Sequence, residues 1–365
     1  MIKKYYSDID VVTAARQRVI NIFRTAPKVS LQISGGKDSI VLNDIVFKLC
    51  SSGEVDKSKL VVDFVDEEAI YPCIEKIVKK MRMQWLSIGV EFCWWCIEVR
   101  HYNCFNALTS DESFICWDRY KENVWVRPKP KFAISEHPLL NKRSDTYQMF
   151  IERMRKDSIQ ISGVRCSESL QRVSAIAKKK TFNKLYPIYD MNDKDVWRYI
   201  LENNLDLPDA YLFLYQTGAS LNRLRLSQFF SIDTAGSLVS MCEYYPELFD
   251  KICKREPNAY MAMLYYDTEM FRRQKERGQV QKDRDIDYKA KVLELLYNDD
   301  FFQSDTAKKM QNRIKQMVMV HGSMISNLNY KRIYNTLIGG DPKLRSCRAI
   351  LMDIFANTGK DLING

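Results

Sequence analysis

Up to about residue 204, short apolar runs alternate with amphipathic stretches, which is the pattern of an α/β protein with a parallel sheet. The runs at 29–33 and 60–65 are almost continuously apolar, as expected of strands that are covered on both faces. Amphipathic helices follow them, and the same patterns predict elements on either side. The predicted helices are 8–24, 38–50, 69–83, 143–157 and 192–203, and the further strands are 85–90 and 158–162. Asn192 or Asp193 is the predicted cap of the last of these helices. We therefore expect a doubly wound, mostly parallel sheet that binds its ligand at the carboxyl ends of its strands.

Beyond residue 204 the alternation stops and the periodic stretches are helical. The predicted helices lie at 209–216, 237–255 with a break at Pro246, 258–277, 287–298, 304–320 and 346–356. A length of 365 residues suits two domains. We predict an α/β domain over 1–204, with an insertion at about 91–142, and a mostly α C-terminal domain over 205–365.

The insertion is rich in aromatic residues and is followed by a basic stretch. It contains four of the six tryptophans, and the net charge of the whole chain is +10. Aromatic and basic side chains together are typical of proteins that bind single-stranded nucleic acid or a flat base. They are equally typical of a small aromatic core beneath a solvated basic face, and the pattern does not separate the two.

Neither a membrane-spanning run of roughly 18 apolar residues nor an apolar secretory stretch at MIKKYYSD is present in the sequence. We therefore expect a cytoplasmic protein without membrane contact. The ten cysteines are then expected to be mostly free thiols.

The segment ISGGKDS, residues 33–39, carries the clearest chemistry. It lies between a predicted strand and a predicted helix, and Gly35 and Gly36 allow the backbone N–H groups to approach an anion. The helix N-terminus adds free N–H groups and the positive end of the helix dipole. Lys37 adds a full charge, and Ser34 and Ser39 add hydroxyl groups. This junction is predicted to bind phosphate, although its spacing is not that of the Walker loop.

SGGKDS resembles the signature of the PP-loop ATP pyrophosphatases, whose fold is adenine-nucleotide alpha-hydrolase-like. The resemblance implies that the loop holds the β- and γ-phosphates of ATP as a leaving pyrophosphate. It also implies that Lys37 and Asp38 belong to the catalytic group and that chemistry takes place at the α-phosphorus. A pyrophosphate leaving group requires Mg²⁺ on electrostatic grounds, and Asp38 is one candidate ligand.

A second block, GVRCSESLQR followed by YPIYDMNDKDVWRYI, resembles the phosphoadenylyl-sulfate (PAPS) reductase branch of these proteins. In that branch the block closes over the nucleotide, which implies ligand contacts for Gly163, Arg165 and Glu168. Arg165 follows a strand end, and its guanidinium fork suits a phosphate. Arg172 is a second candidate for charge neutralisation at the α-phosphate. The alternative for Glu168 and Arg172 is an ordinary ion pair four residues apart on a helix.

Asp66 directly follows the strand at 60–65, where this branch places an acidic residue. The resemblance implies contact with nucleotide or magnesium. The other interpretation is a helix N-cap, for which an aspartate is equally suited.

The region from WVRPKP to EYYPELFDKICKREPNAYMAMLYY resembles the subfamily with a C-terminal domain of unknown function that is typified by the immunoglobulin-binding regulator A. That subfamily is usually encoded on prophages beside a ParB-like protein, which implies a ParB-like partner. The Glu-Cys-Gly tail that carries the nucleophile of PAPS reductases has no counterpart here, since Cys347 lies in RSCRA. This difference disfavours sulfonucleotide reduction.

A metal cluster is a further possibility that the sequence raises. Cys93 and Cys96 have the spacing of half a zinc or iron–sulfur site, which Cys104 and Cys116 would complete. The remaining spacings match no known ribbon, and two tryptophans fill the turn, so we favour buried thiols.

These patterns lead to one main expectation and two alternatives. We expect a protein that binds ATP and Mg²⁺, cleaves ATP between the α- and β-phosphates, and adenylates or activates an acceptor such as nucleic acid. The alternatives are a PAPS reductase, and a non-catalytic nucleotide- and DNA-binding regulator or phage-defence component that acts with a ParB-like partner. Assembly into a homo-oligomer is compatible with either.

Overall fold

The computed structural model describes residues 8–103, 113–168, 172–173, 176, 183–216, 224, 226, 229, 237–265, 286–323, 325–339, 349–350 and 352. The chain forms two compact units. The first comprises Met1–Arg100 with Ile115–Gln228, and the second comprises His101–Phe114 with Phe229–Gly365. Residues 205–228, which the sequence pattern grouped with the C-terminal helices, therefore lie in the first unit.

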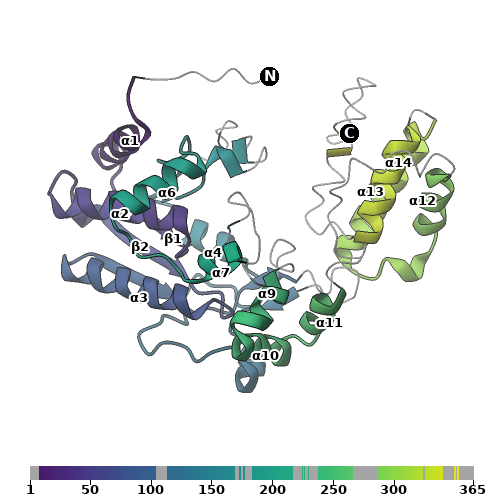
Figure 1. Ribbon diagram of the computed structural model, residues 1–365, viewed down its shortest axis with the longest axis horizontal. Coiled ribbons are helices and arrows are strands. Elements are labelled where there is room, and N and C mark those ends of the chain that lie inside the picture. The colour runs from purple at the N-terminus through teal and green to yellow at the C-terminus, as the bar shows by residue number, and fades with distance from the viewer. Residues whose placement is uncertain are drawn as a thin grey trace. The chain divides into compact units, whose positions relative to one another are not determined.

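The first unit is built on a five-stranded sheet with the order β3-β2-β1-β6-β7 (Figure 1). Each pair of neighbouring strands is parallel. The strands are β1 (Val29–Ile33), β2 (Leu60–Val65), β3 (Glu91–Trp95), β6 (Ile159–Ser162) and β7 (Lys184–Leu185). The chain proceeds from β1 to β2 and β3 on one side and later adds β6 on the other side. The carboxyl end of β1 is thus the topological switch point, where sheets of this kind form their ligand crevice.

Helices cover both faces of this sheet. Trp94 and Trp95 are neighbours on β3, so their side chains face opposite sides. Trp95 packs against Phe150 of α4, with ring centroids 5.2 Å apart, whereas Trp94 packs against Phe132, which lies beneath Arg82 of α3. The α-helices of this unit are α1 (Val11–Thr25), α2 (Lys37–Ser51), α3 (Pro72–Ser87), α4 (Tyr147–Met154), α6 (Asp193–Glu202) and α7 (Ala210–Gln216). Its 3₁₀ helices are η1 (Lys57–Lys59), η3 (Arg119–Val124) and η4 (Cys166–Glu168). The predicted doubly wound α/β fold is confirmed.

The third predicted strand was wrong. Residues 85–87 continue helix α3, and the strand is Glu91–Trp95 instead, which the sequence pattern assigned to the insertion. The buried face of α3, which includes Met81, extends to Trp85, whose indole N–H donates to Asn43 Oδ1 at 2.8 Å. Four of the five residues of β3 are buried, so it resembles the other central strands.

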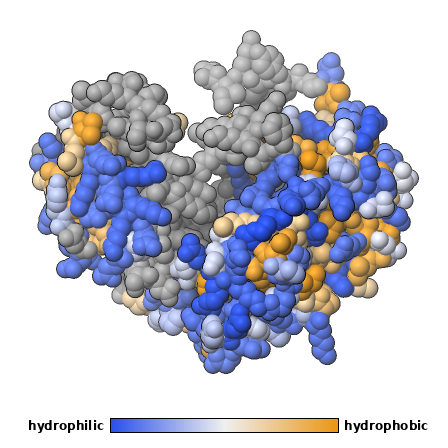
Figure 2. Space-filling view, turned by 180° about the vertical axis from the view of Figure 1, so that it is seen from behind, coloured by the Kyte–Doolittle hydropathy of each residue, from blue (hydrophilic) through white to orange (hydrophobic). Residues whose placement is uncertain are grey.

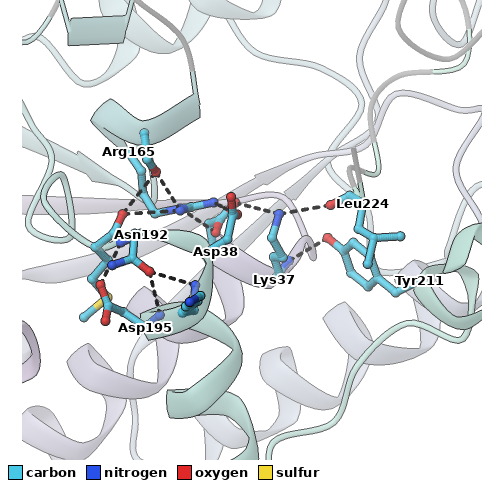
Figure 3. Close-up of polar contacts among 11 residues, drawn as sticks. Lys37, Asp38, Arg165, Asn192, Asp195, Tyr211 and Leu224 are labelled. Carbon is cyan, nitrogen blue, oxygen red and sulfur yellow. Dashed lines mark hydrogen bonds and ion pairs between the residues drawn. The ribbon is translucent and has the colours of Figure 1, made fainter. Parts of the chain in front are cut away.

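The predicted caps and helix starts can be compared directly with the structure. Asn192 caps α6, and its side chain and that of Asp195 form a reciprocal capping box (Figure 3). Helix α3 begins at Pro72 after Tyr71, which occupies the N-cap position, rather than at residue 69. The interpretation of Asp66 as a helix cap was therefore wrong.

The second unit is mainly helical. A buried apolar core, including Val292, Ile314 and Ile333, joins α12, α13 and α14. Helix α14 was not predicted, and the predicted helices 258–277 and 346–356 continue outside the described residues. The helices are α9 (Ser237–Tyr244), α10 (Pro246–Arg255), α11 (Asn258–Tyr265), α12 (Tyr288–Leu296), α13 (Asp305–His321) and α14 (Asn327–Gly339), with 3₁₀ helix η6 (Asp299–Phe301). A two-stranded sheet consists of β4 (Arg100–Tyr102) and β5 (Ser113–Ile115).

The surface is largely polar. Figure 2 shows one face, on which hydrophilic residues predominate and apolar residues lie in groups between them. Within the described part of the chain, none of the helices is long and apolar enough to cross a membrane.

Candidate functional site

The glycine loop connects β1 to α2 at the carboxyl edge of the sheet. Gly35 has φ +73°, and a Cβ built there would lie 2.8 Å from a methyl group of Ile74 and 2.9 Å from one of Val78. Only glycine therefore fits this position. The Ser34 N–H donates to Ser39 Oγ at 2.9 Å, which closes the loop onto the first turn of α2. The N-cap residue of α2 makes no side-chain capping bond, so the helix begins without a cap of its own.

Lys37 is buried at this helix N-terminus, and two oxygen atoms of the same unit are bound to it (Figure 3). Its backbone N–H donates to the hydroxyl of Tyr211 at 2.8 Å, and its Nζ donates to the carbonyl oxygen of Leu224 at 3.0 Å. Burial lowers the pKa of the Lys37 amine below its ordinary value of 10.5, and nearby Asp38 opposes this change. The backbone N–H and one N–H of the ammonium group therefore already bind acceptors from the protein itself.

Asp38 is held on the opposite side of the loop by Arg165, whose side chain is fully buried. Arg165 Nε lies 2.7 Å from Asp38 Oδ1, and its Nη2 donates to Asp193 Oδ1, also at 2.7 Å. Its Nη1 donates to Ser167 Oγ at 2.8 Å. The second carboxylate oxygen of Asp38 is 3.5 Å from Lys37 Nζ. The structure thus joins the two predicted blocks into one charged cluster at the start of α2. Both Nη atoms of Arg165 donate hydrogen bonds, and its Nε faces Asp38 in an ion pair.

Gly163 brings the two blocks together. A Cβ at this position would lie 2.8 Å from both the carbonyl carbon and the carbonyl oxygen of Asp38, and 3.0 Å from the backbone nitrogen of Ser39. These are backbone atoms at the start of a helix and cannot rotate away as a flexible side chain can. The exit of β6 approaches the glycine loop this closely because residue 163 lacks a side chain.

Asp66 lies at the same edge of the sheet, but its carboxylate is buried and fully engaged. Its Oδ1 accepts from the Glu68 N–H at 3.1 Å, and its Oδ2 accepts from the indole N–H of Trp94 at 2.7 Å. Arg127 forms an ion pair with the same Oδ2. In this conformation Asp66 therefore anchors the insertion to the end of β2.

Arg172 and Glu168 are described less completely. Arg172 is half-buried, and its charge lies near the half-buried Tyr147. Burial and the Glu67 carboxylate raise the pKa of the Tyr147 phenol, while Arg172 lowers it. The side chain of Glu168 and its predicted pairing with Arg172 lie outside the described residues.

The cysteines named for a metal cluster make separate contacts. Cys93 contacts Arg155, at 3.4 Å from Nη2, whereas Cys96 contacts Asp66, at 3.6 Å from Oδ2. Burial raises the pKa of the Cys93 thiol to about 12 and raises that of Cys96 further still. Cys104 lies outside the described residues, and the described ones contain no group of three or more candidate metal ligands.

Several residues of the site were missed by sequence reasoning. Tyr211 and Leu224 come from the segment expected to belong to the C-terminal domain, and only the three-dimensional structure brings them to the loop. Asp193 was considered only as a helix cap. Arg127 lies within WVRPKP, which was noted for resemblance alone, although a basic residue between a tryptophan and two prolines is a usable signal of a fixed cation.

The profile of the phosphoadenosine phosphosulfate reductase domain family matches residues 28–232. The uncharacterized protein YbdN of Escherichia coli strain K12 is 24% identical over 333 residues, which are 84% of this chain and 79% of that protein.

Two solved structures are similar to this chain at low sequence identity. The PAPS reductase of Candida auris, in a phosphate complex, is 13% identical, with a TM-score of 0.31 over 63% of this chain and 98% of that one. The FMN adenylyltransferase of Candida glabrata is 14% identical, with a TM-score of 0.31 over 57% of this chain. The match spans 63% of the length of that adenylyltransferase.

Proposed function

Because the chain belongs to the phosphoadenosine phosphosulfate reductase domain family, we propose that this protein binds ATP at the glycine loop and cleaves the ATP between the α- and β-phosphates. The observation that carries this proposal is the state of Lys37. Its backbone N–H and its ammonium group each hold an oxygen acceptor, and these acceptors come from Tyr211 and Leu224. Phosphate oxygens are acceptors of the same kind and carry the negative charge that the Tyr211 hydroxyl and the Leu224 carbonyl lack.

The leaving pyrophosphate takes the place of these two oxygens. The Lys37 N–H and Nζ bind its oxygens, and the backbone of Gly35 and Gly36 leaves room for them. Ser39 Oγ, which already accepts from the Ser34 N–H, can donate its own proton to the same group. Nucleotide binding therefore requires the Tyr211 hydroxyl and the Leu224 carbonyl to leave the loop.

The reaction is an attack of an acceptor on the α-phosphorus. A bond forms between the acceptor and that phosphorus, and the bond to the oxygen that bridges to the β-phosphate breaks. Negative charge develops on the departing pyrophosphate. Lys37 and the N-terminus of α2 stabilise it because they are fixed before the reaction begins.

Mg²⁺ would enter with the phosphates, since this ion usually binds through one or two carboxylates and the phosphates of the substrate. When bound, it would neutralise charge on the pyrophosphate. Of the two predicted ligands, Asp38 fits this role better, because its side chain is 16% exposed, whereas Asp66 is fully buried and accepts hydrogen bonds with both carboxylate oxygens. We assign Arg165 the role of a positioning residue, which orients Asp38 through the 2.7 Å contact between them.

The acceptor is proposed in class only. The basic charge of the chain supports an anionic acceptor such as nucleic acid, and a ParB-like protein is the partner that the sequence resemblance suggests.

The test is incubation of the protein with α-labelled ATP and magnesium, with and without DNA, followed by separation of the products. We expect labelled AMP or an adenylated product, together with pyrophosphate. Labelled ADP with inorganic phosphate would overturn the position of the cleavage. Nucleotide-dependent thermal stabilisation without any turnover would favour the binding regulator. Release of sulfite from PAPS with thioredoxin would favour the reductase.

A further inference from the structure

A second lysine of the first unit, Lys129, lies partly out of water without an oxygen partner. It stands between Pro128 and Pro130, which restrict the backbone on both sides, and it is half-buried. Within the described part of the chain, the Lys129 ammonium makes no hydrogen bond and no ion pair. Burial lowers the pKa of its amine.

Two tryptophan rings surround this ammonium group instead. Lys129 Nζ lies 4.7 Å from the centroid of the Trp125 ring and 5.5 Å from that of Trp117. The rings meet edge to face at 85°, with centroids 5.4 Å apart. The guanidinium carbon of Arg127 lies 5.2 Å from the same Trp117 ring. Indole faces attract a cation and hold it in place, but they do not neutralise its charge.

The backbone that holds this cage is strained. Glu68 and Trp117 are both fully buried and both adopt the left-handed conformation, with φ +66° and +53°. They bind each other, because the Trp117 N–H donates to Glu68 Oε2 at 2.7 Å. Glu68 also accepts from the Val126 N–H with Oε1 and from Arg127 Nε with its carbonyl oxygen. Strain that the surroundings enforce in this way is found preferentially at ligand sites.

Of the nearby carboxylates, Glu98 and Glu136 form ion pairs with other cations. Glu98, Glu122 and Glu136 lie close enough to favour the charged form of Lys129, but none contacts it. The charge partners of the surrounding acids are Arg119 and Arg143 for Glu98, Lys142 for Glu136, Arg127 for Asp66, and Lys79 and Arg127 for Glu75. Lys129 is therefore held beside the two indole rings, and its ammonium group remains available to an anion from outside the protein.

We propose that Lys129, with the Trp117 and Trp125 rings behind it, is the binding site for a tetrahedral oxyanion, sulfate or phosphate. A single ammonium point charge suits one oxygen of such an ion, whereas the fork of neighbouring Arg127 is taken up by Asp66 and Glu75. The site belongs to the same edge of the sheet as the glycine loop. Arg127 reaches Glu75 in the first turn of α3, and the next residue back, Ile74, packs on Gly35. The inference does not depend on ATP cleavage.

The probe is the fluorescence of the tryptophans that touch Lys129. The protein is titrated with sodium sulfate at constant ionic strength, with sodium chloride as the balancing salt, and separately with adenosine 3′,5′-bisphosphate. We expect a saturable change in the wild-type protein. In Lys129→Met, which keeps the side-chain stem, the affinity should fall by about tenfold or more. Lys131→Met is the matched control, because Lys131 is exposed and stands two residues further along the same run.

Two further variants separate this site from the glycine loop and from misfolding. The sulfate response should persist in Lys37→Met, even if that variant no longer binds ATP, and it should be retained in Lys129→Arg. Saturation by sulfate would identify the free ion as the ligand, and saturation by the bisphosphate alone would identify a phosphate carried on a nucleotide. An unchanged response in Lys129→Met, or no saturation by either probe, would overturn the proposal.

Discussion

Two lysines near the carboxyl edge of the sheet, the buried Lys37 and the half-buried Lys129, have opposite kinds of partner. At the end of β1, the Lys37 ammonium group and backbone N–H are bound by the oxygen atoms of Leu224 and Tyr211. Beyond β2 and β3, Lys129 has two indole faces and no oxygen atom. Burial lowers the pKa of both amines. The two lysines differ in whether an incoming ligand must first displace oxygen atoms of the protein.

At Lys37 an incoming anion has to displace acceptors that are already bound, so its affinity reports the difference between two sets of hydrogen bonds. At Lys129 it meets a cation with no competitor. The Lys37 site, which is filled by the protein's own groups, is therefore expected to be selective. Only a ligand with several well-placed oxygens forms stronger hydrogen bonds than the ones it displaces. The open site should accept simple oxyanions.

The largest expected effect comes from removing the ammonium group of Lys37. Lys37→Met should weaken ATP binding by roughly 10- to 150-fold, because a hydrogen bond to a charged group is worth about 1.5–3 kcal/mol. Isothermal titration with ATP and magnesium measures this change. Lys48→Met is the control, since Lys48 is exposed on the same helix and should leave the affinity as it is. Equal affinities for the two variants would show that the loop is not the nucleotide site.

The second largest effect is expected from crowding the close contact between residue 163 and the start of α2. Gly163→Ala places a methyl group 2.8 Å from the Asp38 backbone, and overpacking of this kind costs about 1–3 kcal/mol. We expect a lower urea midpoint together with weaker ATP binding. Gly339→Ala, at the end of α14, meets no atom within 4 Å and should be neutral or slightly stabilising. If both variants unfold like the wild type, the contact at Gly163 is looser than the structure indicates.

A smaller effect on ATP affinity, in the opposite direction, is expected from removing the competing hydroxyl of Tyr211. Tyr211→Phe removes the hydroxyl that occupies the Lys37 N–H, so ATP should bind about three- to tenfold more tightly, as one neutral hydrogen bond is worth about 1 kcal/mol. Tyr215→Phe is the matched control, because Tyr215 is an exposed residue of the same helix. Weaker binding in Tyr211→Phe would mean that the hydroxyl helps to hold the nucleotide rather than competing with it.

The smallest effect is on pH dependence. Because burial lowers the pKa of Lys37, the free protein loses this charge at a pH below 10.5. ATP binds the charged form, so the apparent affinity should begin to fall with rising pH before 10.5 is reached. The same depressed pKa means that the unfolded chain binds more protons just below pH 10.5, so the contribution of Lys37 to folding stability rises with pH across that interval. Titrations of ATP against pH in wild type and Lys37→Met isolate the effect, which would be absent if Lys37 titrated normally.

The sequence predicted the elements that follow a simple period, and it failed where a contact depends on distant segments. Strands 29–33 and 60–65 and the cap at Asn192 follow from local pattern, and the structure confirms them. The third strand was misplaced because apolar residues around Trp85 suit a helix and a strand equally well. Asp63 appeared within a run taken to be apolar, although it is buried and paired with Arg155 at 2.8 Å.

The candidate site shows the same division. The loop residues and Arg165 were named from motifs, and the structure brings Lys37, Asp38 and Arg165 into one cluster. No local signal could show that Tyr211 and Leu224 reach Lys37, because more than 170 residues separate them from it. Nor could it show that Asp66 would be enclosed by the insertion. The contacts of these residues remain the decisive part of the proposal, and they are fixed by tertiary packing.

The most direct test is a crystal structure of the protein with magnesium and α,β-methylene ATP, in which the bond that should break is replaced. The expected result is that phosphate oxygens take the positions now held by the Tyr211 hydroxyl and the Leu224 carbonyl at Lys37. A nucleotide bound elsewhere, with both of these hydrogen bonds to Lys37 intact, would contradict it.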